Sequence, residues 1–221
     1  GSKKACYHYV RKALSFGISV VNGIPVLVTH DEDIIELAER NNACIIGDDF
    51  KSQIGGTILH HALLHLLNMR GVKVNKTHQI NYAGNMDFLN LMTKRGYEKH
   101  ISKKRGIIAG EHDDLDISVN VSYVENQDDN KICFINIEGE NFGGCPISLE
   151  CKLSVVDSAN SSGVLIEAIR SLVIAKELGR SGRIEEASAF FMKSPYVQIP
   201  DEEAYVRLNE LLGVSYESNT Y

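Results

Sequence analysis

The chain has 221 residues, of which 43% are hydrophobic and 24% charged, and its formal net charge is −6. This length can bury a sizeable core in one large domain or two small ones. An acidic balance without a block of Lys and Arg argues against nucleic acid as a partner, and no stretch approaches the ~20 continuous apolar residues that span a membrane. Five cysteines without C-x-x-C spacing predict reduced, mostly buried thiols and hence a cytoplasmic protein.

The first part of the chain alternates helix-like and strand-like segments. The spacing of apolar residues predicts a helix over 3–16 and a second helix from Asp31 to Asn41. Short apolar runs predict strands over 18–21 and 43–46. Helices and strands joined by short links are typical of a parallel α/β sheet. We therefore expect the chain to begin in the middle of such a sheet.

The rest of the chain has a mixed pattern. A strand is expected over 72–82, and helices are expected over 57–69, 87–95 and 161–178 and after Pro200. Three further β-like runs, separated by turn residues, cover 117–124, 132–138 and 147–156. We expect these three strands to form an antiparallel meander.

The segment over 47–52, which reads Gly-Asp-Asp-Phe-Lys-Ser, lies between a predicted strand and the helix that begins near Thr57. A glycine-bearing strand-to-helix turn directs backbone N–H groups and the positive end of a helix dipole outward, which suits a phosphate. Lys51 and Ser52 would add a positive charge and a hydroxyl donor. The same turn can equally serve as a plain helix cap, so both interpretations stay open.

Two polar clusters in the middle of the chain could also carry chemistry. Residues 81–87, Asn-Tyr-Ala-Gly-Asn-Met-Asp, would present amides to a hydroxyl-rich ligand, or their side chains would satisfy their own turn. Lys99 and Lys103 would share one face of a helix, where like charges are unfavourable unless an anion lies between them. The alternative for both lysines is a solvated basic patch, whereas a buried lysine here would exchange protons near neutrality.

Three further observations leave similar choices. Lys193 lies in an apolar context, so its ammonium either reaches out to solvent or meets an anion. Asp157 follows an apolar strand, where it would contact a ligand or cap the next helix. His61 and His65 have i, i+4 spacing, but the glutamate of a zincin motif does not accompany them. We therefore favour an ordinary helix that lies partly in the core, and we predict no metal site.

Taken together, these segments resemble the inositol-1-phosphate synthase (inositol-3-phosphate synthase) family, particularly its prokaryotic branch. The resemblance rests on five segments in the family's order: 47–52, 84–90, 99–103, 157–158 and 191–195. It covers most of this chain but only the second, catalytic part of the family's usual length. It implies an NAD-dependent isomerase of inositol and phospholipid biosynthesis. Such an enzyme converts glucose 6-phosphate to 1D-myo-inositol 3-phosphate by oxidation, enolisation, intramolecular aldol closure and reduction.

The resemblance also implies an architecture. Residues 1–50 would be the remnant of a Rossmann-type nucleotide-binding domain. Residues 51–195 would form an α+β catalytic and oligomerisation domain, and 196–221 a C-terminal helical segment that returns toward the Rossmann part. The expected fold class is thus α/β, with the end of a Rossmann-type parallel sheet followed by an α+β domain. A homodimer or homotetramer is implied as well.

The resemblance assigns roles to individual residues. The implied catalytic residues are Lys99, Lys103, Lys193 and Asp157. Contacts to the sugar-phosphate substrate are implied for Ser52, Gln53, Ile54, Asn81, Asn85 and Asp87. Contacts to NAD are implied for Asp49, Asn22 and Gly23. These types of residue suit the reaction, because oxyanions beside a phosphate need converging cations and aldol closure needs a sugar held nearly cyclic by many polar contacts.

Two departures from the family pattern remain. No G-x-G-x-x-G fingerprint occurs in the chain. A lysine that eukaryotic relatives carry on the strand before the acidic turn falls at Ser122 here. We therefore expect no turnover by these 221 residues alone. The alternative functions are a non-catalytic relative that binds a sugar phosphate or assembles with a partner, and an NAD(P)-linked oxidoreductase of another substrate.

Overall fold

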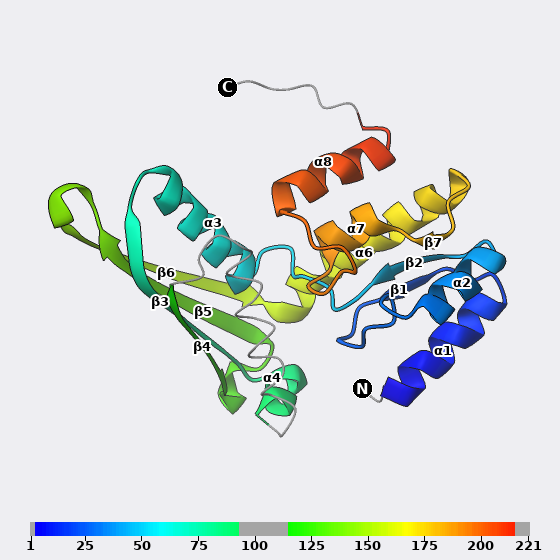
Figure 1. Cartoon of the computed structure of the whole chain (residues 1–221). Coiled ribbons are helices and arrows are strands. Elements are labelled where there is room, and N and C mark those ends of the chain that lie inside the picture. Colours follow the sequence, from blue (N-terminus) through cyan, green and yellow to red (C-terminus); the bar gives the residue numbers. More distant parts are fainter. Residues whose placement is uncertain (1–2, 93–114, 215–221) are drawn as a thin grey trace. The chain divides into compact units, whose positions relative to one another are not determined.

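The computed structural model describes residues 3–92 and 115–214 (Figure 1). The chain divides into two compact units, one made of Gly1–Lys51 with Ser161–Tyr221 and one made of Ser52–Asn160. Residues 161–195, expected in the α+β domain, therefore belong to the unit that contains the N-terminal residues. The physical reason is that the long helix over this stretch buries its apolar face against a strand of that unit.

The first unit, called the parallel-sheet unit below, contains a three-stranded parallel sheet in the order β1-β2-β7. Its elements are α1 (Lys3–Ser15), β1 (Val20–Asn22), α2 (Glu32–Arg40), β2 (Cys44–Gly47), most of α6 (Asp157–Glu177), β7 (Gly182–Arg183), α7 (Glu185–Phe191) and α8 (Asp201–Leu211). Asp31 caps α2 by accepting a hydrogen bond from the Asp33 N–H. β7 and α7 were not predicted, because such short elements carry too little periodicity.

β2 forms the centre of this unit, with helices on both faces of its sheet (Figure 1). On one face Ile45 lies in a buried cluster with Leu14 of α1 and Ile34 of α2. On the other face Ile46 lies in a cluster with Leu172 of α6 and other side chains of α7 and α8. Alternate residues of one strand thus enter two separate cores, as in open parallel α/β sheets.

The second unit, called the mixed-sheet unit, contains a four-stranded sheet in the order β4-β3-β5-β6. Its elements are α3 (Gly56–Met69), β3 (Lys73–Ala83), α4 (Met86–Leu91), β4 (Asp116–Tyr123), β5 (Asn130–Glu140) and β6 (Pro146–Val156), with short 3-10 helices at Glu125–Gln127 and Phe142–Gly144. α3 covers one face of the sheet, where Leu64 and Leu67 pack with Ile117, Ile135 and Ile137. The α/β fold class is confirmed by the two units together.

The predicted meander of three consecutive strands is wrong. β3 lies between β4 and β5, parallel to β4 and antiparallel to β5, and only β5 and β6 form the expected antiparallel pair. Alternate residues in the second half of β3 are buried, because one face of the strand is covered. Thr77, Gln79, Asn81 and Ala83 are all buried on the face toward α3, and a central strand also has both of its backbone edges paired.

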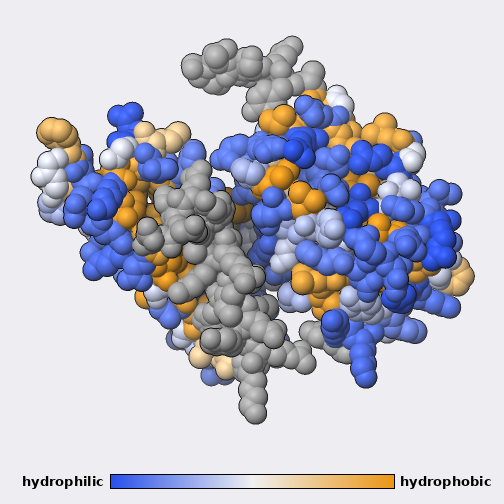
Figure 2. All heavy atoms as spheres, in the orientation of Figure 1, coloured by the Kyte–Doolittle hydropathy of each residue, from blue (hydrophilic) through white to orange (hydrophobic). Residues whose placement is uncertain are grey.

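The surface of the parallel-sheet unit is mainly hydrophilic on the face shown in Figure 2, with scattered hydrophobic residues among the polar ones. All five cysteines are free thiols, and Cys145 is the exposed one. Among the residues that the structure describes, no helix is long and apolar enough to cross a membrane.

Candidate functional site

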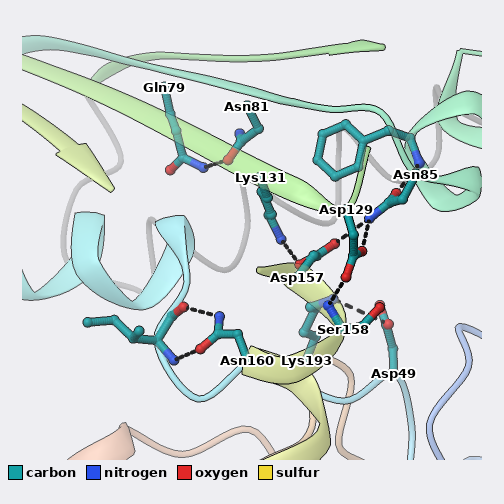
Figure 3. Close-up of polar contacts among 12 residues, drawn as sticks. Asp49, Gln79, Asn81, Asn85, Asp129, Lys131, Asp157, Ser158, Asn160 and Lys193 are labelled. Carbon is teal, nitrogen blue, oxygen red and sulfur yellow. Dashed lines mark hydrogen bonds and ion pairs between the residues drawn. The ribbon is translucent and has the colours of Figure 1, made fainter. Parts of the chain in front are cut away.

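In the parallel-sheet unit, the turn after β2 is joined to the segment after α7. Asp48 and Ser194 exchange backbone hydrogen bonds of 3.3 and 3.1 Å, and the Lys193 N–H donates to the Asp49 carbonyl at 2.6 Å. The Lys193 ammonium lies 3.4 Å from the Asp49 carboxylate (Figure 3). Two of the sequence segments that were singled out, far apart along the chain, are therefore neighbours in the fold.

Asp48 is fully buried beneath this turn and stabilises it. Its carboxylate accepts hydrogen bonds from the Asn22 amide at 2.6 Å and from the Thr29 N–H and hydroxyl at 3.0 and 2.8 Å. Burial raises the pKa of Asp48, although these hydrogen bonds act in the opposite direction. The Asn22 amide nitrogen also donates to the Val26 carbonyl at 2.7 Å, so both of its N–H groups have partners within this unit.

Gly23 and Lys51 also have structural roles in the parallel-sheet unit. A Cβ on Gly23 would lie 2.5 Å from the Phe50 ring, so glycine allows the turns after β1 and β2 to approach each other. The Lys51 ammonium donates to the Asp201 carboxylate at 2.6 Å and to the Ala189 carbonyl at 3.0 Å. The Lys51 ammonium therefore has two partners within the parallel-sheet unit, and the expectation that it adds a charge beside a phosphate stays a prediction.

In the mixed-sheet unit, the beginning of α3 has the properties of an anion site. α3 has 14 residues, its N-cap residue Gly55 makes no side-chain capping bond, and its first turn contains no acid. The first N–H groups of an α-helix have no partner within the helix, and the helix dipole adds positive potential there. These features of the start of α3 agree with the phosphate interpretation of the sequence, which stays a prediction.

Asn160 holds the loop that leads into α3, and the sequence analysis did not single it out. The Gln53 N–H donates to the Asn160 carbonyl at 2.9 Å. The Ile54 N–H donates to the Asn160 side chain at 3.2 Å, and the Ile54 carbonyl accepts from that side chain at 2.5 Å (Figure 3). The backbone of this loop is thus held in place by one residue, Asn160.

Asp157, the first residue of α6, forms a cluster with three other polar side chains of the mixed-sheet unit (Figure 3). The Lys131 ammonium lies 3.0 Å from the Asp157 carboxylate. The Asn85 amide nitrogen donates to Asp157 at 3.1 Å and to Asp129 at 3.2 Å. The Asn85 side-chain oxygen also accepts from the Phe88 N–H and so caps α4. Asn85 thus bonds within its own turn and to two neighbouring carboxylates, and its contact with a hydroxyl-rich ligand stays a prediction.

This cluster holds one cation against two carboxylates. Desolvation raises the pKa of Asp129, but hydrogen bonds from Ser158 and Asn85 and the charge of Lys131 outweigh it and lower that pKa. The side chains of Lys131 and Asp157 are only 19% and 14% exposed. Electrostatic attraction is stronger where water is largely excluded, so the Lys131 ammonium is suited to stabilise a developing oxyanion.

Lys131 is the cation that the sequence analysis missed. The position of an additional lysine of the family was expected to correspond to Ser122. Ser122 is an exposed residue on β4, before the acidic turn. Lys131 lies on β5, the strand that follows this turn, and it is the lysine that pairs with Asp157. The available signal was the run Asp-Asn-Lys over 129–131, which places a cation directly after two turn residues.

A chain of buried polar side chains connects α3 to Asn81. The ring of His60 lies 2.7 Å from the Thr77 hydroxyl through Nε2 and 3.1 Å from the Gln79 side-chain oxygen through Nδ1. Gln79 donates to Asn81 at 3.0 Å (Figure 3). Burial lowers the pKa of His60 to about 4, so the ring is neutral near pH 7. His60 is therefore a core residue with two polar partners.

Comparison with known proteins assigns the chain to a family. A family model described as Myo-inositol-1-phosphate synthase matches residues 55–158, which include α3, the four-stranded sheet and the Lys131–Asp157 pair. The inositol-3-phosphate synthase of Mycolicibacterium smegmatis is 39% identical over 96% of this chain and 61% of its own length. The chain belongs to the inositol-3-phosphate synthase family. It spans 61% of the length of that curated relative.

Solved structures agree with this membership of the inositol-3-phosphate synthase family. The crystal structure of Ari2 is 33% identical, with a TM-score of 0.79, over 96% of this chain and 61% of that chain. A myo-inositol-1-phosphate synthase-related protein from Thermotoga maritima is 29% identical, with a TM-score of 0.75, over 96% of this chain and 56% of that chain.

The residues expected from the resemblance to inositol-3-phosphate synthases are distributed over both units. Asp49 and Lys193 meet in the parallel-sheet unit, and Asn85 and Asp157 meet in the mixed-sheet unit. Gln53, Ile54 and Asp87 are exposed, and Ser52 and Asn81 are half-buried and buried. Lys99 and Lys103 lie outside the described residues. Within residues 3–92 and 115–214, no group of three or more His, Cys, Asp or Glu side chains could hold a metal ion.

Proposed function

We propose that this chain is the sugar-phosphate-binding and oxyanion-stabilising part of an inositol-3-phosphate synthase. The reaction is the NAD-dependent isomerisation of glucose 6-phosphate to 1D-myo-inositol 3-phosphate. The observation that carries the proposal is the cluster of Lys131, Asp157, Asn85 and Asp129, in which a largely buried ammonium is held in place by a carboxylate. An isomerisation through enolate and alkoxide oxygens needs such fixed cations.

The phosphate of the substrate would bind at the beginning of α3. The uncapped first turn supports this, as does the loop over Ser52 and Gln53 that Asn160 holds. Lys103 would add a cation there, as the resemblance implies. Anchoring the phosphate converts ring closure into a reaction between two ends of one tethered molecule, which lowers its entropic barrier.

The sugar would contact the polar side chains of the same unit. Asn81, Asn85 and Asp87 would bind its hydroxyl groups. Once C5 has been oxidised to a ketone, loss of the C6 proton to a base leaves negative charge on the oxygen at C5, and Lys131 would stabilise it together with Lys99. The enolate carbon then attacks the C1 aldehyde, and the new oxyanion at C1 takes a proton from an ammonium group. Asp157 would keep the Lys131 ammonium charged and aimed throughout.

The residues at the carboxyl ends of β1 and β2 fit one edge of an NAD site. Open parallel sheets bind ligands at this end of their strands, and the Asp49 carboxylate there is paired with Lys193, whose side chain is 44% exposed. Asp49 would contact the cofactor, while Asn22 and Gly23 would shape the turn. NAD, when bound, supplies the hydride acceptor and later the hydride donor. Asp49 would also hold the Lys193 ammonium, for which the resemblance implies a catalytic role.

Isothermal titration of the purified chain with glucose 6-phosphate, with and without NAD, tests the proposal. We expect saturable binding that Lys131→Met weakens by at least about tenfold, because the charge-assisted contact is lost. Lys152→Met is the matched control, since Lys152 is an exposed lysine on β6. The absence of binding by the wild-type chain under both conditions would contradict the proposal.

The same experiment separates the alternatives. Tight binding of glucose 6-phosphate that does not depend on NAD would favour a non-catalytic sugar-phosphate binder. We expect no turnover by the 221 residues alone with NAD, and NMR analysis would detect inositol phosphate if that expectation is wrong. A product with a net redox change would indicate an NAD(P)-linked oxidoreductase instead. Sedimentation equilibrium would test the predicted homodimer or homotetramer.

A further inference from the structure

Resting on the sugar-phosphate function proposed above, we propose that Tyr196 is a positioning residue for Lys193, the lysine for which the resemblance implies a catalytic role. The Lys193 side chain is 44% exposed, and its ammonium lies 3.4 Å from the Asp49 carboxylate (Figure 3). A long lysine side chain at a surface loses conformational freedom when it is held in one place. The Lys193–Asp49 pair therefore depends on how firmly the backbone at Lys193 is fixed.

The ring of Tyr196 contacts two side chains from other parts of the parallel-sheet unit. The guanidinium carbon of Arg183 lies 3.7 Å from the centre of this ring, which is a stacking distance. The ring of His30 meets it edge-on, with ring centres 5.5 Å apart and an angle of 69° between the planes. These three residues, Arg183, Tyr196 and His30, are called the Tyr196 clamp below. Two contacts of different geometry favour one position of the Tyr196 ring.

Arg183 is itself fixed, so it can hold the Tyr196 ring in place. It is the last residue of β7, and its side chain is only 11% exposed. Its Nε donates to the Thr29 carbonyl at 2.8 Å, and a terminal guanidinium nitrogen donates to the Glu32 carboxylate at 2.9 Å. A planar guanidinium makes both bonds and still presents its flat face to a ring, which a lysine ammonium cannot do.

The backbone between Tyr196 and Lys193 is stiff. Pro195 lies directly before Tyr196 and is buried. The proline ring fixes the φ angle of Pro195, and it also restricts the backbone of Ser194. A tyrosine ring that is held in one position therefore limits the positions that are open to Lys193.

His30 connects the Tyr196 clamp to the same backbone a second time. Its Nε2 lies 3.2 Å from the Ser194 carbonyl oxygen, which is an acceptor, so Nε2 is the donor. The Ser194 carbonyl also accepts from the Asp48 N–H at 3.3 Å, and the Lys193 N–H donates to the Asp49 carbonyl at 2.6 Å. The clamp thus acts on the backbone from which the Lys193 side chain extends toward Asp49.

The surroundings of Tyr196 favour this positioning role over a role in the core. Its side chain is 45% exposed, and it belongs to neither of the two buried hydrophobic clusters of its unit. Its partner Arg183 lies at the carboxyl end of β7. Open parallel sheets bind ligands at the carboxyl ends of their strands. The Tyr196 clamp therefore lies at the end of the sheet where a positioned lysine is useful.

Zero-length carbodiimide cross-linking tests the positioning role, because it joins an amine to a carboxylate only where the two groups meet. Mass spectrometry of the cross-linked peptides would measure the yield of the Lys193–Asp49 amide. We expect Tyr196→Ala to lower this yield by at least about threefold, because both ring contacts are lost. Tyr196→Phe keeps the ring and should stay within about twofold of wild type. Arg183→Lys keeps the charge but not the flat face, and should lower the yield as Tyr196→Ala does.

Two controls separate positioning from a general loss of structure. The Lys76–Glu138 pair of the mixed-sheet unit, whose charged atoms lie 2.9 Å apart, should cross-link equally in all variants. Tyr205→Ala removes another tyrosine of the parallel-sheet unit, which is 42% exposed, and it should leave the Lys193–Asp49 yield unchanged. Circular dichroism should show that all variants are folded.

An unchanged Lys193–Asp49 yield in Tyr196→Ala, or an equal fall in the yields of both pairs, would overturn the positioning role and leave the proposed function intact. A wild-type chain that does not bind glucose 6-phosphate in titration would instead refute the proposed function, because the cross-linking experiment contains no sugar.

Discussion

Acidification should destabilise the mixed-sheet unit through His60. Burial, with smaller contributions from the charges of His78 and His61, lowers the pKa of His60 from 6.5 to about 4, against an opposing hydrogen bond to Gln79. Between these two pH values the unfolded chain binds a proton that the folded unit does not bind. The stability that the neutral His60 ring contributes is therefore fully present above pH 6.5 and is lost progressively as the pH falls toward 4.

The size of this effect follows from the difference in pKa. The drop from 6.5 to about 4 is ~2.5 pH units, and each unit corresponds to ~1.4 kcal/mol, so the free energy of unfolding should fall by up to ~3.5 kcal/mol. This is a large part of the ~5–15 kcal/mol that stabilises a typical domain. The unit should consequently unfold at a much lower urea concentration near pH 4 than at pH 7.

Urea unfolding followed by pulsed hydrogen exchange and mass spectrometry measures this effect. Peptides from α3 and β3 report on the mixed-sheet unit, separately from peptides of the parallel-sheet unit. The control is His60→Asn, whose side chain does not titrate. The two proteins are compared by the slope of their free energy of unfolding against pH, because the constant effect of the substitution on stability cancels in that slope. All other titrating groups are the same in both proteins. Equal slopes in wild type and His60→Asn would refute the reasoning.

Three further substitutions should change stability. Gly56→Ala should destabilise the unit by ~2 kcal/mol in thermal melts, because a Cβ 2.5 Å from the Cys133 sulfur outweighs the ~1 kcal/mol gain in helix propensity; a raised melting temperature would contradict this. Lys131→Met should cost ~2 kcal/mol by leaving Asp157 without its cation, and an unchanged urea midpoint would show that the pair is unimportant. Asp48→Ala should cost ~3 kcal/mol by orphaning three buried donors, which differential scanning calorimetry would detect.

Local structure was largely predictable because it depends on neighbours in the sequence. The apolar run before Gly47 forms β2, and the helix expected from Asp31 begins one residue later, with Asp31 as its N-cap. The pairing of strands was not predictable in this way. Periodicity shows that alternate residues of β3 are buried, but it does not state which strands lie beside it, so the parallel pairing with β4 was missed.

The sequence by itself determined most helices, most strands and the family, because these rest on periodicity and on short runs of residues. Only the tertiary structure decided the partners of the polar side chains. Lys131 meets Asp157 across 26 positions of the chain, and Asn160 clamps Ile54 across 106. Hydrogen bonds and ion pairs act over a few ångströms in space, and partners so far apart along the chain leave no pattern in the sequence. The ion pair of Lys131 and the buried hydrogen bonds of His60 could therefore not be predicted from the sequence.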